Sequence, residues 1–211
     1  MIPTREEWIN ALVERHGKER QNGFLNATVA VCGLGGLGSN IANALTRAGI
    51  GKLILIDFDK VDIKNLNRQQ YKMSQIGKYK TESCLENLRE ISPYTEIEIH
   101  TVKLTEENIP KLLGTADIIC EAFDKADQKA MLVNTVLETF PDKYILSGTG
   151  MAGFGSANTI QSRKAFGKLY LSGDEKSDVN DGIGLVASRV MVCAAHEAHM
   201  VLRILSGEKD V

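Results

Sequence analysis

Four glycines within six residues give the clearest chemical signal in the sequence. Residues 33–38 read Gly-Leu-Gly-Gly-Leu-Gly and directly follow the apolar run 28–32. The spacing G-x-G-x-x-G between a strand and a helix is typical of a loop whose backbone approaches a phosphate. Glycine permits that close approach, and the helix N-terminus offers free N–H groups. We therefore expect a nucleotide site built on Gly33, Gly35, Gly36 and Gly38.

Charged side chains follow the next apolar run and add to this site. Asp57 ends the run, 19 residues after Gly38, where a carboxylate can accept hydrogen bonds from ribose hydroxyls. This placement suits NAD and ATP equally. In the polar stretch that follows, Arg68 offers a rigid fork for phosphate oxygens. Lys80 begins a predicted helix, where a cation opposes the helix dipole unless an anion lies nearby, and this indicates a phosphate contact.

Alternating strands and helices must position these residues. Helical patterns predict helices at residues 4–20, 39–48, 80–91, 106–113, 126–139 and 183–205. Short apolar or alternating runs predict strands at residues 28–32, 53–56, 96–102, 116–121, 144–146 and 168–171. Such alternation implies a parallel sheet with right-handed crossovers. The predicted fold class is α/β: a Rossmann-like, mostly parallel sheet with helices on both faces, an irregular segment and a long C-terminal helix.

Composition limits the classes of protein to which the chain can belong. The 211 residues include 25 Lys and Arg against 27 Asp and Glu, and 43% are apolar. This length favours one domain, and near-neutral charge argues against nucleic-acid or membrane binding driven by charge. No apolar run of about 18 residues predicts a transmembrane helix. The polar N-terminus lacks the apolar region of a signal peptide, so we expect a cytoplasmic protein.

The polar motifs resemble those of the ubiquitin-like-protein activating enzymes, in the branch of ThiF and MoeB. The phrases ERHG, NLNRQQY, MLVNTVLE, GMAG and CAAHEAHMVLRI are most similar to short bacterial ThiF proteins of thiamine biosynthesis. The matching stretches cover about half the chain and lie in the family's order: residues 33–40, 57–70, 77–83, 91–93 and 117–124.

The resemblance implies an activity and assigns roles within it. The family adenylates the C-terminal Gly-Gly carboxylate of a small ubiquitin-fold sulfur carrier, here of the ThiS type, with ATP and Mg²⁺, and releases pyrophosphate. The glycines would lie under the nucleotide, Asp57 would hold the ribose and Asp124 would bind magnesium. No general base is needed, because a carboxylate is already ionised near neutral pH. The triphosphate would be contacted by Asn65, Arg68 and Lys80, with Asp59 and Gln69 close by.

The family also uses an arginine of the first helix, which reaches the site across a dimer interface. Arg15 and Arg20 are the candidates here, and we favour Arg15. The implied assembly is therefore a homodimer. The expected catalytic residues are Arg15, Arg68, Lys80 and Asp124.

The cysteines depart from the pattern of many relatives. Cys32, Cys84, Cys120 and Cys193 form no C-x-x-C pair, so we expect no structural zinc. Residues 172–182 lack the cysteine that some relatives bond covalently to the carrier. Cys193 is interpreted as a packing residue of the last helix, and the nearby pair His196 and His199 as packing or interface residues.

These inferences define one adenylating domain over residues 1–211. Three alternative functions remain open. An enzyme that dehydrates the threonylcarbamoyl group of a tRNA base would also adenylate a carboxylate, although the low net charge disfavours a tRNA substrate. An NAD-dependent oxidoreductase would leave Asn65, Arg68, Lys80 and Asp124 unexplained. A binding module with a degenerate pocket would not retain these charges. The expected parts are an N-terminal helix within 1–22, a nucleotide-binding core over 27–147, a carrier-facing irregular segment over 148–182 and a C-terminal helix over 183–206.

Overall fold

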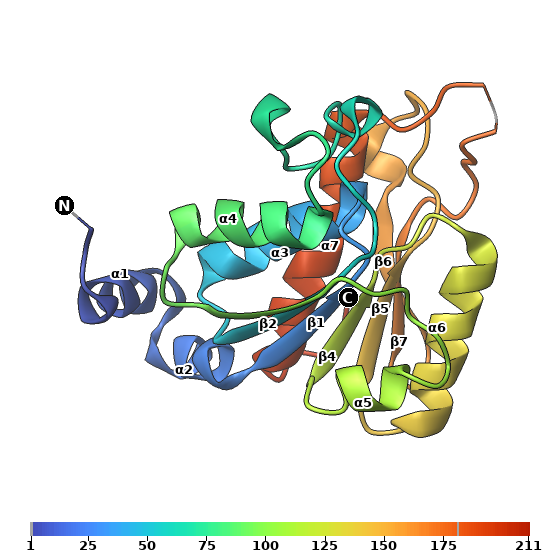
Figure 1. The fold of residues 1–211 in the computed structure, drawn as a ribbon. Helices are drawn as coiled ribbons and strands as arrows, with labels where there is room; N and C mark the ends of the chain where they lie inside the picture. Colours follow the sequence, from blue (N-terminus) through green and yellow to red (C-terminus); the bar gives the residue numbers. More distant parts are fainter. Residues whose placement is uncertain (1, 181) are drawn as a thin grey trace.

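A seven-stranded sheet organises the computed structural model, which describes residues 2–180 and 182–211. The strand order is β3-β2-β1-β4-β5-β7-β6 (Figure 1). All neighbouring pairs are parallel except β6 and β7. This confirms the expected α/β fold class with a mostly parallel sheet. The strands are β1 Thr28–Cys32, β2 Lys52–Ile56, β3 Glu96–His100, β4 Ile118–Glu121, β5 Tyr144–Gly148, β6 Gln161–Phe166 and β7 Leu169–Gly173.

Helices cover both faces of the sheet. Figure 1 shows α3, α4 and α7 on one face and α5 and α6 on the other. Short 3-10 turns lie at Ile63–Asn65, Met73–Gln75 and Ala157–Thr159. The helices are α1 Arg5–His16, α2 Lys18–Asn26, α3 Gly36–Ala48, α4 Lys80–Ile91, α5 Ile109–Leu113, α6 Ala126–Thr139 and α7 Ala187–Leu205.

The two central strands explain why the sheet is buried on both sides. Val29 and Val31 of β1 pack under α3 and α7, whereas Ala30 and Cys32 pack against α5 and α6. Successive side chains of a strand point to opposite faces, so a strand between two helical layers must be apolar throughout. No helix within residues 2–180 and 182–211 is both long and apolar enough to cross a bilayer.

The N-terminal helix differs from its prediction, because the chain breaks at Gly17. A capping box begins α1, since Glu7 N–H donates to the Thr4 hydroxyl and Thr4 N–H donates to the Glu7 carboxylate. Gly17 has φ +83, a left-handed conformation that ends α1 at once and starts α2 in a new direction. The single predicted helix over 4–20 is therefore two helices, and the second continues to Asn26.

The segment 148–182 has more regular structure than expected. The predicted strand at 168–171 is confirmed as β7, but β6 precedes it and pairs with it antiparallel. β6 reads Gln-Ser-Arg-Lys-Ala-Phe and is exposed along most of its length, as an edge strand can be. Without an apolar face it carries no strand pattern that sequence reasoning could recognise.

Candidate functional site

The carboxyl ends of the parallel strands open into one cavity of about 930 Å³. It lies where the strand order reverses between β1 and β4, the place at which open α/β sheets bind ligands. Loops that follow β1, β2, β4 and β5 form its walls. The cavity brings together most of the predicted residues, namely Gly33, Gly35, Gly36, Asp57, Asp59, Asn65, Arg68, Gln69, Lys80 and Asp124.

The glycines of the loop have two different tasks. Gly33 has φ +93, and a Cβ there would lie 2.8 Å from the carbonyl oxygen of Ala122. A Cβ on Gly38 would lie only 1.8 Å from the Gly33 carbonyl oxygen, so this glycine lets α3 pack on the loop. Gly35, in contrast, has only the Gln69 amide nitrogen within 4 Å, at 3.8 Å. Gly38 therefore serves packing and does not line the cavity, whereas Gly35 leaves room for a ligand.

Asp57 is a buried carboxylate that fixes the loop to the end of β2. Leu34 N–H donates to its Oδ2 at 2.6 Å, and Asp59 N–H donates to its Oδ1 at 2.8 Å. Burial raises the pKa of Asp57, while the Lys80 charge and these two N–H donors act against the rise. Asp57 therefore holds the loop backbone in place and still faces the cavity.

Lys80 is not the solvated lysine that its type suggests. Its side chain is 8% exposed, and Nζ lies 2.9 Å from Asp59 Oδ2 and 3.8 Å from Asp57 Oδ2. It is the first residue of α4, whose N-terminus repels a cation. The anion that the sequence requires beside Lys80 is thus already supplied by two carboxylates of the chain. Helix placement alone therefore does not require a phosphate there.

Two buried polar atoms beside the cavity have no protein partner. They are Arg68 Nε and Gln69 Oε1. Arg68 uses Nη1 to donate to the Lys64 carbonyl and the Asn67 amide oxygen. Burial lowers the pKa of Arg68, and the nearby Asp124 charge opposes that change. Since buried polar groups are nearly always paired, these atoms indicate where a polar ligand would bind.

Three side chains that the sequence analysis did not select hold the polar stretch on α3. Asn40 Nδ2 donates to the carbonyls of Gly36 and Arg68, and the Ser39 hydroxyl accepts from Gln70 N–H. The Tyr71 hydroxyl donates to the Leu34 carbonyl at 2.8 Å. Ser39 and Asn40 belong to the glycine motif in sequence, and that adjacency was the one available signal of their role.

Asp124 lies at the cavity, just beyond β4. The described residues contain no group of three His, Cys, Asp or Glu side chains that could hold a metal. Protein sites for Mg²⁺ that act on nucleotides often use one or two carboxylates together with phosphate oxygens. Asp124 therefore fits magnesium as a companion of a bound nucleotide, and the structure offers no separate protein cage.

A second buried group of polar residues lies beneath this site. Glu121 and Glu197 are both fully buried, and Lys129 Nζ lies 2.7 Å from Glu121 Oε2. Neither carboxyl oxygen of Glu197 has a hydrogen-bond partner, and burial raises its pKa well above the ordinary value. Neither glutamate was among the residues selected from the sequence.

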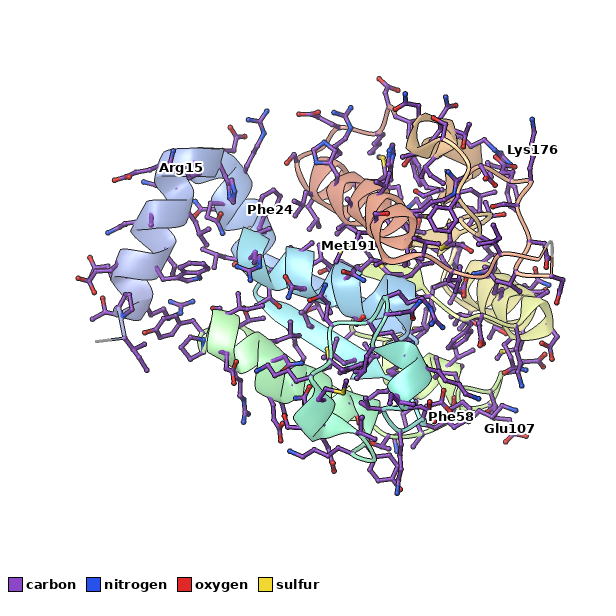
Figure 2. The ribbon with its side chains drawn as sticks, turned by 90° about the horizontal axis from the view of Figure 1, so that it is seen from above. Arg15, Phe24, Phe58, Glu107, Lys176 and Met191 are labelled. Atoms are coloured by element: carbon purple, nitrogen blue, oxygen red, sulfur yellow. The ribbon has the colours of Figure 1, made fainter. Side chains whose placement is uncertain are left out.

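The remaining candidates lie away from the cavity. Figure 2 shows Arg15 at the opposite end of the molecule from Phe58 and Lys176, two residues that line the cavity. Its guanidinium therefore cannot contact a ligand in the cavity of its own chain. Arg20 is also exposed and pairs with Glu208.

The cysteines fit packing roles, whereas the two histidines of α7 differ in exposure. All four cysteines are buried and free, and burial raises the pKa of Cys193, whose thiol donates to the Ser172 carbonyl. His196 Nδ1 lies 3.2 Å from the Ser162 hydroxyl on the neighbouring edge strand. His199 is exposed on the same helix.

Comparison with known proteins agrees with this geometry. In sequence, ubiquitin-like modifier-activating enzyme 5 of Caenorhabditis elegans is 50% identical over 78 residues, which is 37% of this chain and 19% of that protein. The same enzyme of Drosophila ananassae is 41% identical over 113 residues, 53% of this chain and 28% of that protein. The matched segments thus span less than a third of these relatives.

Solved structures show the same fold at low sequence identity. The E. coli tRNA N6-threonylcarbamoyladenosine dehydratase TcdA in complex with ATP aligns with a TM-score of 0.87, at 20% identity and over 98% of both chains. E. coli MccB with ATP aligns with a TM-score of 0.69, at 22% identity over 91% of this chain and 59% of that one. The ThiF family profile matches residues 9–211. Since that match covers nearly the whole sequence, the chain belongs to the ThiF family.

Proposed function

We propose that this protein binds ATP in the cavity and uses it to adenylate the C-terminal carboxylate of a small ubiquitin-fold carrier. The observation that supports this most is the pair of unpartnered buried atoms, Arg68 Nε and Gln69 Oε1, beside a glycine loop. Lys80 and Asp57 complete a polar wall suited to phosphates and ribose. Membership of the ThiF family supports the same chemistry.

The charges at the site suit an attack of one anion on another. Adenylation joins a carboxylate oxygen to the α-phosphorus and breaks the bond to the leaving pyrophosphate. Positive charge lowers this barrier, because attacker, target and leaving group are all negative. Arg68 and Lys80, which both line the cavity, supply that charge, and the N-terminus of α3 adds free N–H groups. When magnesium is bound, with Asp124 as its protein ligand, it neutralises further charge on the phosphates.

The cavity extends beyond the nucleotide wall toward the carrier-facing segment. Residues 148–152 and 175–179 line this end, next to the end of β5. Gly150 has φ +70 and lies against Asp174 and Glu175. An extended tail without side chains would fit such a passage, as a Gly-Gly terminus does. A ThiS-type sulfur carrier is our proposed substrate, and the names of the curated relatives agree with a ubiquitin-like partner.

A homodimer would bring Arg15 to the site of the neighbouring subunit. The side chain is exposed on α1 and lies away from its own cavity (Figure 2). An arginine from a second subunit could then add to the positive charge on the phosphates. This dimer is the assembly that we propose.

A second candidate function is the dehydration of a modified tRNA base. Its support is the alignment with TcdA over 98% of both chains. At 20% identity this alignment shows the fold alone, and the near-neutral net charge does not favour tRNA. An NAD-dependent oxidoreductase is disfavoured, because it would leave Arg68 and Asp124 at the cavity without a role. Carrier-dependent exchange of pyrophosphate into ATP tests the leading proposal.

A further inference from the structure

An ion pair between a fully buried carboxylate and a partly buried lysine supports the turn that bears Asp124. Glu121 is the last residue of β4 and is fully buried, and Lys129 lies on α6. Their charged atoms are 2.7 Å apart. The Ser147 hydroxyl of β5 donates to the same carboxyl oxygen of Glu121. Three elements of the fold thus meet at this pair.

The pair holds the backbone of the turn on both sides of Phe123. Phe123 N–H donates to Glu121 Oε1 at 2.6 Å, and Lys129 Nζ donates to the Phe123 carbonyl at 3.1 Å. That carbonyl belongs to the peptide bond with Asp124. Ala122 N–H also donates to the Cys32 carbonyl at the end of β1. The backbone from 122 to 124 is therefore fixed by groups outside the turn.

Asp124 itself depends on this backbone for its direction. Its side chain is exposed and has no hydrogen-bond partner within the described part of the chain. The fold removes the Glu121 charge from water, and replacing such an ion pair by apolar residues of similar size often stabilises a fold as well or better. Stability alone therefore does not explain Glu121 and Lys129, whereas their contacts to the turn do.

We propose that Glu121 and Lys129 are positioning residues, which fix the turn so that Asp124 presents its carboxylate to a magnesium-bound nucleotide in the cavity. The inference rests on the proposed function, in which Asp124 is the magnesium ligand. Glu121 does not line the cavity, whereas Lys129 reaches its edge with a side chain that is 23% exposed. Both act through the backbone at Phe123.

The test measures ATP affinity by calorimetry, once with Mg²⁺ and once with a chelator. The variant is the double substitution Glu121→Gln with Lys129→Met, which leaves no buried charge unpaired. Its affinity without metal is expected to stay within about twofold of the wild type. The gain in affinity from Mg²⁺ is expected to fall about tenfold, as when an outer partner of a metal ligand is lost. Lys72→Met, which removes an exposed ion pair with Glu90, is the matched control and should keep the full gain.

A cycle with Asp124→Asn separates positioning from general damage. Asp124→Asn alone should remove the gain from Mg²⁺, and adding the double substitution should then change nothing further. A full gain from Mg²⁺ in the double variant, or a further loss on top of Asp124→Asn, would overturn the inference. If the wild type binds no ATP with or without Mg²⁺, the proposed function itself is wrong. That result differs from the two results that would overturn only the positioning role.

Discussion

Lys80 Nζ lies 2.9 Å from Asp59 Oδ2, in a position where the side chain is only 8% exposed. The cation assigned to the triphosphate is therefore already paired with a carboxylate of its own chain. The pair keeps a buried ammonium satisfied at the N-terminus of α4, where the helix dipole would otherwise oppose it. An incoming phosphate must share this lysine with Asp59 and Asp57.

Replacing Lys80 tests whether its positive charge promotes adenylation. Lys80→Met removes positive charge at the phosphates, and we expect the adenylation rate to fall about 100-fold or more. Without the lysine, the pKa of Asp57 should rise further, because the Lys80 charge now opposes the effect of burial. Steady-state kinetics of pyrophosphate exchange measure the rate. The neighbouring Lys78→Met, which loses an exposed pair with Glu86, should keep the rate, and equal rates for both variants would refute the role of Lys80.

The different roles of Gly38 and Gly35 predict that an alanine lowers stability at the first position and ATP affinity at the second. Gly38→Ala places a Cβ 1.8 Å from a backbone oxygen, so the backbone must move and the free energy of unfolding should fall by about 3 kcal/mol. Gly35→Ala meets nothing closer than 3.8 Å and should fold with a stability near the wild type's, while its ATP affinity falls. Urea unfolding and nucleotide titration distinguish them. A stable Gly38→Ala variant would contradict the packing role.

Glu197 should make stability depend on pH. Burial raises the pKa of Glu197 well above its ordinary value of 4.5, so the folded chain keeps a proton that the unfolded chain releases. The contribution of this group to stability is complete below the unfolded pKa and is lost as the pH rises toward the folded pKa. The free energy of unfolding should therefore fall as the pH rises above the ordinary pKa of 4.5, by up to about 1.4 kcal/mol per pH unit.

Glu197→Gln isolates that effect, because an amide has no proton to release in this range. The variant should lose this part of the pH dependence, whatever its absolute stability. Urea unfolding at several pH values gives both slopes. Equal slopes for the variant and the wild type would show that Glu197 ionises in the folded protein.

The proposed dimer predicts complementation between two inactive proteins. If Arg15 acts on the neighbouring subunit, Arg15→Ala and Lys80→Met subunits should each be inactive in their own dimers. A mixed dimer would contain one complete site, with Lys80 from one chain and Arg15 from the other. After equal mixing and exchange of subunits, activity should return to about a quarter of the wild type's, since half the dimers are mixed. No recovery from subunits that do exchange would exclude this role for Arg15.

Much of the site followed from the sequence because parallel strands end at one edge. Asp57 follows the apolar run that forms β2, and Asp124 follows the run that forms β4. The sequence could therefore predict that both line one cavity. The bounds of β1, α4 and α6 also match the prediction. The Lys80–Asp59 pair could not be foreseen, because a polar stretch carries no periodicity that fixes where its side chains point.

Other features depended on contacts between distant parts of the chain. Glu121 and Glu197 lie 76 residues apart in sequence and become neighbours only when α7 packs on the sheet. β6 has a polar, exposed sequence, and only its pairing with β7 makes it a strand. The break at Gly17 depends on its positive φ, and a single glycine in the sequence does not predict that conformation.

Exchange of labelled pyrophosphate into ATP is the most direct test of whether this protein adenylates a carrier. The assay combines this protein, ATP, Mg²⁺ and a ThiS-type carrier that ends in Gly-Gly, with the same carrier shortened by its two glycines as the control. We predict exchange that requires the intact carrier and is lost in Lys80→Met. No exchange with any Gly-Gly-ended carrier of the source organism, or ATP turnover stimulated by tRNA and not by a carrier, would contradict the account.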